Sequence, residues 1–496
     1  MSNSWEASAD ERMIDTAIPV APQKKGQPVL AWVVIVVLVG LIVWQHTAAP
    51  PASSAAATED VDMRIIGRYL VGLKDLAKLV GEEVGEKPYE SAKKSLDTGP
   101  VDRRLRFVAL TGELAGPIQA NAQLTLLENK LAEKGIPKTP EQTALMDTLR
   151  RLYEDYTAGQ LQAPSVSKEQ RQQLERDLGW FGELALAPPG DPDKAAREAV
   201  LSPARRTLFT LAGLVIGVVL VGLLGLVGLV IFVSFLFRGR LQRGVHTGLL
   251  HGGVYAETFA VWMALYLGLS LGAAKLGFPA DARWLLICLA SLLSLSALFW
   301  PVLRGIPWAQ VRWEIGLRPG RQPGLEPVVG AATYAMALPM LALGVLVMFL
   351  ILQIEGAFQG PTRTMDTFDP IHIPSHPVME PLIAHDWWVR LQVFVLASVI
   401  APIVEETMFR GVLYRHLREA TGRWAFALSV LFSATLVSFV FAVIHPQGLE
   451  AVPPLMALAF TFCLVREWRG SLVPSMIAHG INNAVVLSFL ILAVGK

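Results

Sequence analysis

Apolar residues in this 496-residue chain are gathered into long runs separated by polar segments. A bilayer's hydrocarbon is crossed by a helix of roughly 20 apolar residues, and most of the runs approach that length. One run spans 29–44, and eight more follow at about 208–237, 254–274, 283–303, 329–354, 387–408, 424–445, 452–466 and 474–494. The pattern predicts an all-α fold, a polytopic transmembrane helical bundle of about eight or nine spans.

The segment 50–205 is polar, charged and patterned for helices that lie in water. Thr139 precedes Pro140 and Gln142, which is the sequence signature of a capping box with a first-turn proline. Ser167 and Gln170 repeat the cap. We expect an inserted helical domain without a catalytic signature of its own.

The first apolar run is interpreted as an uncleaved membrane anchor. It is longer than the usual core of a signal peptide, and its leader is long and partly acidic. Small residues follow the run, which leaves cleavage open as the alternative. The predicted organisation is a disordered cytoplasmic tail (1–27), an anchor (28–46), an extracytoplasmic helical domain (50–205), accessory transmembrane helices and loops (206–384), and a reactive core (385–494).

Basic residues in the short loops predict the orientation, because positively charged loops stay in the cytoplasm. With the spans as given, four arginine groups fall on one side of the bilayer. Their members are Arg238, Arg240 and Arg243; Arg304, Arg312, Arg318 and Arg321; Arg410, Arg415, Arg418 and Arg423; and Arg466 and Arg469. We expect a multi-pass protein of a bacterial inner membrane with a cytoplasmic N-terminus and the helical domain outside.

Composition agrees with a chain whose main partner is the lipid bilayer. Hydrophobic residues make up 53% and charged residues 17%, and the formal net charge is +1, so nothing indicates nucleic acid as a partner. Cys288 and Cys463, the two cysteines, both lie in apolar runs. They are predicted to be small buried apolar residues rather than a disulfide.

Charged residues inside apolar runs indicate function, because a charge at the bilayer centre costs roughly 2.5–3.5 kcal/mol or more. Glu405 and Glu406 end one such run. On an α-helix Glu406 and Arg410 share a face and can pair, whereas Glu405 points about 100° away and can face a cavity. The alternative for this motif is an interfacial charge patch that reaches to water.

Two later runs add further polar side chains. His445 closes one run, with Phe441 a turn earlier on the same face. His479 and Asn483 are four residues apart in the last run, beside Asn482, so they can meet one ligand. Taken singly, these residues can be interfacial groups or hydrogen bonds between helices.

Together, the carboxylate, two imidazoles and carboxamide can hold a water or a divalent ion bearing a water. The carboxylate can take the water's proton while the nitrogen groups stabilise an oxyanion. Hydrolysis of an acyl bond, most simply a peptide, is the chemistry that this inventory serves best. A second polar cluster is His372, His376, His385 and Asp386, but prolines interrupt it, so a solvated loop is the simpler interpretation.

In order, these three motifs resemble those of the CAAX protease and bacteriocin-processing family of intramembrane endopeptidases. The resemblance covers roughly 385–490. It implies that Glu405 activates water and that Glu406 and Arg410 support the site. It also implies that His445, His479 and Asn483 orient the water or metal and stabilise the oxyanion. The stretch from Trp313 to Arg318 is similar to a short segment that precedes the core in bacterial members.

The resemblance implies a membrane-associated protein or peptide substrate. Zinc or another divalent metal on Glu405, His445 and His479 is one expectation, and a metal-independent glutamate-activated water is the other. The helical domain lies outside the family pattern, which leaves open an extracytoplasmic partner for 50–205. Two other functions remain as alternatives: a non-catalytic scaffold or bacteriocin-immunity-type protein, and a transporter with a Glu/His proton relay.

Straight helices would hold the candidate residues at different depths. At about 1.5 Å per residue, Glu405 lies about 25 Å from a turn at Gly422 and His445 about 35 Å from it, with His479 nearer the cytoplasm. Convergence therefore requires helix tilt or a break at Pro402.

Overall fold

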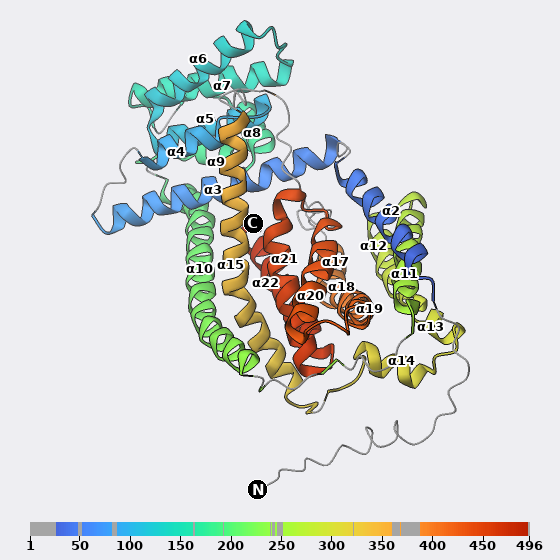
Figure 1. The fold of residues 1–496 in the computed structure, drawn as a ribbon. Coiled ribbons are helices and arrows are strands. Elements are labelled where there is room, and N and C mark those ends of the chain that lie inside the picture. The colour runs from blue at the N-terminus through green and yellow to red at the C-terminus, as the bar shows by residue number, and fades with distance from the viewer. Residues whose placement is uncertain are drawn as a thin grey trace.

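The computed structural model describes residues 26–47, 52–81, 87–161, 164–191, 193–238, 240, 244–245, 251–320, 322–359, 368 and 387–494. Every regular element in these ranges is a helix (Figure 1). Nine helices within them are long and apolar enough to cross a membrane. The predicted all-α bundle with many spans is therefore confirmed. The tail before residue 26 and the cluster from His372 to Asp386 lie outside the described residues.

The polar segment folds as a helical domain at one end of the molecule, with α3 crossing its base (Figure 1). Thr139 and Ser167 both make the predicted capping boxes, each with the glutamine three residues later. The core includes Phe107, Leu110 and Leu149, none of which has any exposed surface. The helices are α3 (Ala52–Leu79), α4 (Lys87–Leu96), α5 (Val101–Leu114), α6 (Pro117–Glu133), α7 (Pro140–Thr157), α8 (Lys168–Leu178) and α9 (Trp180–Leu186).

The helical domain continues into the membrane bundle through one long helix, α10 (Lys194–Phe237). The predicted division between residues 205 and 206 therefore falls inside a continuous helix. α10 packs against α3 and against α15 (Glu326–Gln359). Within its glycine stripe, Gly222, Gly225 and Gly228 lie against α15, whereas the Gly213 and Gly217 positions have no neighbour within 4 Å.

A second group of helices lies on the far side of the core (Figure 1). It comprises α2 (Pro28–Thr47), α11 (Val254–Lys275), α12 (Ala280–Ser294) followed by η1 (Leu295–Phe299), and the short helices α13 (Trp300–Leu303) and α14 (Trp308–Ile315). The anchor α2 packs along α11, and the Trp32 indole donates a hydrogen bond to His416 at 3.2 Å. The anchor is thus an integral helix of the bundle.

The reactive core occupies the middle of the bundle. A continuous helical rod runs through α17 (Trp387–Val395), η3 (Leu396–Ile400), α18 (Ala401–Glu405), η4 (Glu406–Leu413) and α19 (Tyr414–Ala420). It is followed by α20 (Phe426–Val443), the short η5 (Leu449–Ala451), α21 (Val452–Arg469) and α22 (Val473–Val494). Cys288 and Cys463 are free and buried, as predicted.

Arginine-bearing ends of the helices lie opposite the helical domain. The C-terminal end of α10, together with α13 and α14, forms the end of the bundle furthest from that domain (Figure 1). There Arg469 pairs with Glu326 at 2.6 Å, and Arg304 pairs with Glu257 at 2.8 Å. The two ends of the bundle therefore differ in the way that the loop charges predict, while the side on which each end lies stays a prediction.

Candidate active site

The helical rod that carries the first motif is not a regular α-helix. Two π-helical stretches, η3 and η4, flank the single α-helical turn α18. Pro402 stands at the start of that turn, just after η3. A wider turn before a proline accommodates its missing N–H, and π-turns occur often at functional sites. Of the two routes to convergence, helix tilt or a break at Pro402, the break does not occur, because the chain remains helical through Pro402.

The Glu405 carboxylate lies between two imidazoles, one from the bend after α20 and one from α22. Its Oε2 is 3.7 Å from His445 Nε2 and 3.8 Å from His479 Nε2. This Oε2 is buried and has no hydrogen-bond partner, although 21% of the surface of the whole Glu405 side chain is exposed. Both gaps are too long for a direct hydrogen bond, and such gaps are commonly bridged by water.

His445 is fixed by the helix that it follows. Its Nδ1 lies 2.5 Å from the carbonyl oxygen of Phe441, and the two rings are 4.1 Å apart. A carbonyl only accepts, so Nδ1 carries a proton and Nε2 is directed toward Glu405. The predicted contact between His445 and Phe441 is present.

His479 is fixed by Glu406, which also binds Arg410. Glu406 Oε1 accepts from His479 Nδ1 at 3.0 Å and from Arg410 Nη1 at 2.9 Å. Neither Glu406 nor Arg410 has any exposed surface, so the predicted pair is a buried one. The guanidinium also lies over the rings of Phe441 at 4.4 Å and Phe462 at 5.4 Å. The interfacial-patch alternative does not describe these residues.

Three hydrogen-bond acceptors consequently face one another in the neutral site: Glu405 Oε2 and the Nε2 atoms of His445 and His479. Three acceptors that face one another repel, so the site favours a bound molecule that donates hydrogen bonds or carries a positive charge. A water with a proton shared among the three groups satisfies this requirement.

Asn483 takes a different place from the other candidates. Its Nδ2 donates to the carbonyl of Ala397 in η3 at 2.8 Å, and its Oδ1 accepts from Asn482 at 3.1 Å. One turn earlier, a Cβ at Gly480 would stand 2.7 Å from the carbonyl oxygen of Ser398. Asn483 and Gly480 thus hold α22 against the π-helical stretch before Glu405. A direct role for Asn483 in the reaction stays a prediction.

A metal ion was one expectation for this site. The imidazole environments suit one, since metal-ligating histidines donate their other N–H to a carbonyl or carboxylate. The distances of 3.7 and 3.8 Å from Glu405 Oε2 to the two Nε2 atoms suit it less. Ligand atoms bound to a tetrahedral ion at about 2.1 Å lie about 3.4 Å from one another. Within the described part of the chain, no three His, Cys, Asp or Glu side chains are already gathered closely enough to form a metal site. The metal site on Glu405, His445 and His479 stays a prediction.

A turn explains how His445 reaches the depth of Glu405. Residues 421–425 form a turn, so α20 begins only at Phe426. At about 1.5 Å per residue, His445 then lies about 28 Å from the start of α20, close to the 25 Å between Glu405 and Gly422. The sequence-based estimate was longer because it counted the turn as helix.

A recessed start of α22 explains the depth of His479. Leu472, just before α22, donates its N–H to Gly316 O at 3.0 Å, and its Cδ1 lies 3.3 Å from a Cβ position on Gly411. Counted from this contact, Glu405 is six residues away and His479 seven, or about 9 and 10 Å along their helices. The segment after α14 thus sets the start of α22 deep inside the bundle.

A buried ionic cluster that the motifs do not contain surrounds Glu314 in the Trp313–Arg318 stretch. Glu314 accepts from His251 at 2.9 Å and Tyr255 at 2.7 Å, and lies 3.6 Å from Arg415. Burial alone would raise the pKa of Glu314, but the His251 hydrogen bond and the Arg415 charge together hold that pKa below its ordinary value. The similarity of the stretch from Trp313 to Arg318 to a segment in bacterial members was the sequence signal near this cluster.

A second ionic cluster holds α19, the end of the helical rod that carries Glu405 and Glu406. Glu467 of α21 accepts from Arg418 at 3.0 Å and from the Tyr414 hydroxyl at 3.0 Å.

Phe462, which packs 5.7 Å from the His479 ring, is another site residue without a sequence signal. An apolar residue in a span gives no indication of whether it faces lipid or a reactive group.

Comparison with known families agrees with the motifs. Residues 386–485 match the family model described as type II CAAX prenyl endopeptidase Rce1-like, and all six predicted catalytic residues lie within the match. No curated protein and no solved structure matches the chain. The core from 386 to 485 is therefore similar to this family, which suggests a CAAX-type protease within a multi-pass membrane protein.

Proposed function

We propose that this protein is an intramembrane endopeptidase that hydrolyses a peptide bond of a membrane-associated substrate through a water activated by Glu405. One observation carries the proposal. The unpartnered Oε2 of Glu405 lies within 4 Å of the Nε2 atoms of two histidines, His445 just after α20 and His479 in α22. The Rce1-like match at 386–485 supports the same reaction class.

Glu405 is the general base of the proposed reaction. A water between its Oε2 and His445 Nε2 is held by two acceptors, so its oxygen lone pairs remain free to attack a carbonyl carbon. As the water attacks, its proton passes to Glu405. The carboxylic acid that forms then protonates the leaving amine, which restores the carboxylate.

His479 stabilises the oxyanion in this proposal. Its Nδ1 donates to the Glu406 carboxylate, which fixes the ring with Nε2 directed toward Glu405. With a proton on Nε2, the ring presents an N–H to the negative oxygen of the tetrahedral intermediate. Arg410 holds Glu406 in place by its own ion pair, so Glu406 and Arg410 are positioning residues.

The test is cleavage of a peptide library by the purified full-length protein in lipid nanodiscs. Glu405→Gln keeps the shape but removes the base, so we expect cleavage to fall by about 10²–10⁴-fold. Glu450→Gln, on the exposed turn before α21, is the matched control and should retain full activity. A Glu405→Gln variant that cleaves like the control would overturn the proposal.

The same assay also tests whether cleavage requires a bound metal ion. A water that needs only Glu405 and the histidines predicts that dialysis against a chelator leaves cleavage intact. Loss of activity that zinc restores would instead assign Glu405, His445 and His479 as metal ligands. Transport or binding that persists in Glu405→Gln and His479→Ala would support the transporter or scaffold alternatives.

A further inference from the structure

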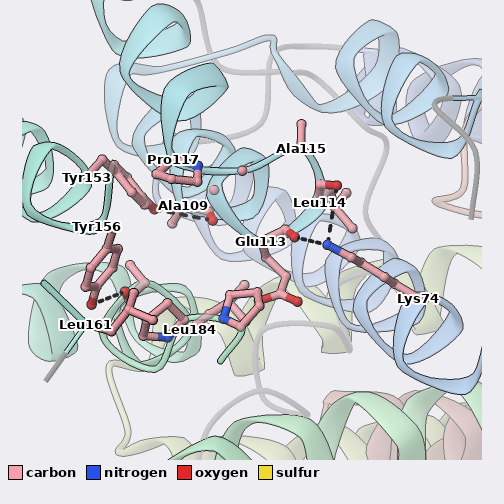
Figure 2. A pocket seen from close by; sticks show the side chains of 15 residues that line it. Lys74, Ala109, Glu113, Leu114, Ala115, Pro117, Tyr153, Tyr156, Leu161 and Leu184 are labelled. Carbon is pink, nitrogen blue, oxygen red and sulfur yellow. Dashed lines mark hydrogen bonds between the residues drawn. The ribbon is translucent and has the colours of Figure 1, made fainter. Parts of the chain in front are cut away.

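The helical domain contains a cavity of about 490 Å³, within the size range of small-molecule sites. It lies between the end of α5, the corner that leads to α6, helix α7 and the segment after α9 (Figure 2). Part of its lining, including Tyr153, Tyr156 and Leu184, belongs to the core of this domain, which shares no residue with the core around Glu405. The cavity is therefore a separate site from the candidate active site.

Lys74 of α3 provides the cationic group of the cavity (Figure 2). In the described part of the chain its ammonium donates to two main-chain carbonyls, those of Glu113 and Leu114, and pairs with no carboxylate. Two carbonyls leave one of its three N–H groups free for a ligand. Burial lowers the pKa of Lys74, so a ligand anion that neutralises the ammonium would be stabilised there.

The one carboxylate that lines the cavity is already neutralised. Glu113 accepts two hydrogen bonds from Arg197, at 2.7 and 2.8 Å, in the paired geometry typical of arginine and a carboxylate. Among the described residues here, the two positive charges of Lys74 and Arg197 therefore exceed the single negative charge of Glu113, which favours an anionic ligand.

The other walls are aromatic and apolar. Tyr156 donates its hydroxyl hydrogen to the Ala185 carbonyl at 3.1 Å, and Tyr153 directs its own toward Ala109. Each phenol oxygen keeps a lone pair that can accept an N–H. Leu161, Leu184 and two prolines complete the apolar surface. The cavity thus offers one cation, two acceptors for N–H groups and apolar walls.

We propose that this cavity binds the free C-terminal end of an apolar peptide. The terminal carboxylate meets the Lys74 ammonium, the last peptide N–H groups meet the oxygens of Tyr153 and Tyr156, and the side chains lie against the leucines and prolines. A fatty acid shares the carboxylate and the apolar chain but lacks the N–H groups, so the two ligands can be told apart.

Calorimetric titration of the full-length Glu405→Gln protein in nanodiscs tests the proposal without interference from cleavage. The probes are acetyl-Ala-Leu-Pro-Leu with a free carboxylate, the same peptide with a C-terminal amide, and hexanoate. We expect the free acid to bind about tenfold or more tighter than the amide, because a charge-assisted hydrogen bond is lost. Equal affinities for acid and amide, or hexanoate binding as tightly as the peptide, would overturn it.

Two variants localise the binding. Lys74→Met should weaken the free acid by about tenfold or more, whereas Lys78→Met, an exposed lysine one turn later, should not. Ala115→Trp fills the cavity from its partly exposed rim and should abolish binding even if loss of Lys74 perturbs α5. Binding that persists in both Lys74→Met and Ala115→Trp, with thermal unfolding unchanged, would exclude this site.

Discussion

At the scale of single residues, the proposed reaction depends on buried charged and imidazole groups that come from different segments of the chain. Glu405, His445 and His479 could be chosen from the sequence because charged and imidazole groups are rare in apolar runs. Their protonation could not, since it depends on the Phe441 carbonyl and on Glu406, which only the fold brings within hydrogen-bond distance. Residue type thus indicates which side chains gather there, and tertiary contacts set the hydrogen bonds of each.

Arg410 should be needed for stability as well as for activity. Arg410→Met leaves the fully buried Glu406 carboxylate without its cation, which typically costs about 3–5 kcal/mol. We expect a large fall in the thermal unfolding temperature of the detergent-solubilised protein. Arg423→Met, on the exposed turn before α20, is the control and should change it little.

The double variant Glu406→Gln/Arg410→Met separates charge from packing. Because it removes both charges together, we expect it to recover part of the stability lost in Arg410→Met. Unfolding of Arg410→Met at the same temperature as the parent would show that the ion pair contributes nothing to the fold.

At the scale of elements, the sequence predicted the spans and the capping boxes but not the π-helical stretches. A spacing of four residues suits Glu406 and Arg410 in either winding, so the pattern cannot distinguish a π-helix from an α-helix. The recessed start of α22 could not be predicted from the pattern of apolar residues either. It depends on the Leu472 to Gly316 hydrogen bond, between segments far apart in the chain.

Gly480 should control the approach of α22 to the motif helix. In Gly480→Ala the new Cβ would stand 2.7 Å from the Ser398 carbonyl oxygen, so the helices must separate by several tenths of an ångström. We expect His479 to move from Glu405 and cleavage to fall by about 100-fold, in line with the sensitivity of catalysis to small misplacements. Kinetics of the purified variant measure this.

Gly272→Ala is the matched control for Gly480→Ala. It lies in another membrane helix, where a Cβ would have no neighbour within 4 Å, and it should leave the rate unchanged. Equal rates for the Gly480→Ala and Gly272→Ala variants would contradict the close packing described for α22.

Glu314 should make stability depend on pH at the arginine-rich end of the bundle. Its pKa is lower in the folded protein, so its ionised form adds stability at neutral pH. That contribution is complete above the ordinary carboxyl pKa of 4.5 and is lost as the pH falls below it. Thermal unfolding between pH 7 and 3.5 should therefore show Glu314→Gln less stable than the parent at pH 7, with the difference shrinking in acid. A constant difference would contradict the assignment.

At the scale of the whole molecule, a membrane bundle is joined to a helical domain by the continuous helix α10. Segment composition was enough to predict both parts. The joint was not predictable, because the change from polar to apolar residues near 205 indicates a boundary, while the structure continues one helix through it and through Pro203. A proline within a long helix is tolerated where neighbouring helices support it.

Cysteine labelling should establish the predicted orientation. Cys288 and Cys463 are buried, so single cysteines introduced on exposed surfaces can be read against a low background. Lys138→Cys in the helical domain should react with a membrane-impermeant maleimide on intact cells, and Arg423→Cys only after permeabilisation. The reverse pattern would place the helical domain in the cytoplasm.

A double-mutant cycle on kcat/KM tests most directly whether Glu405 and His479 act together on one water. Catalytic groups that act as a unit are strongly non-additive. Glu405→Gln and His479→Gln should each lower kcat/KM by about 10²–10⁴-fold, and the double variant should be scarcely slower than either alone. Losses that multiply in the double variant would show that the two side chains act independently, and the account of a shared hydrolytic water would be wrong.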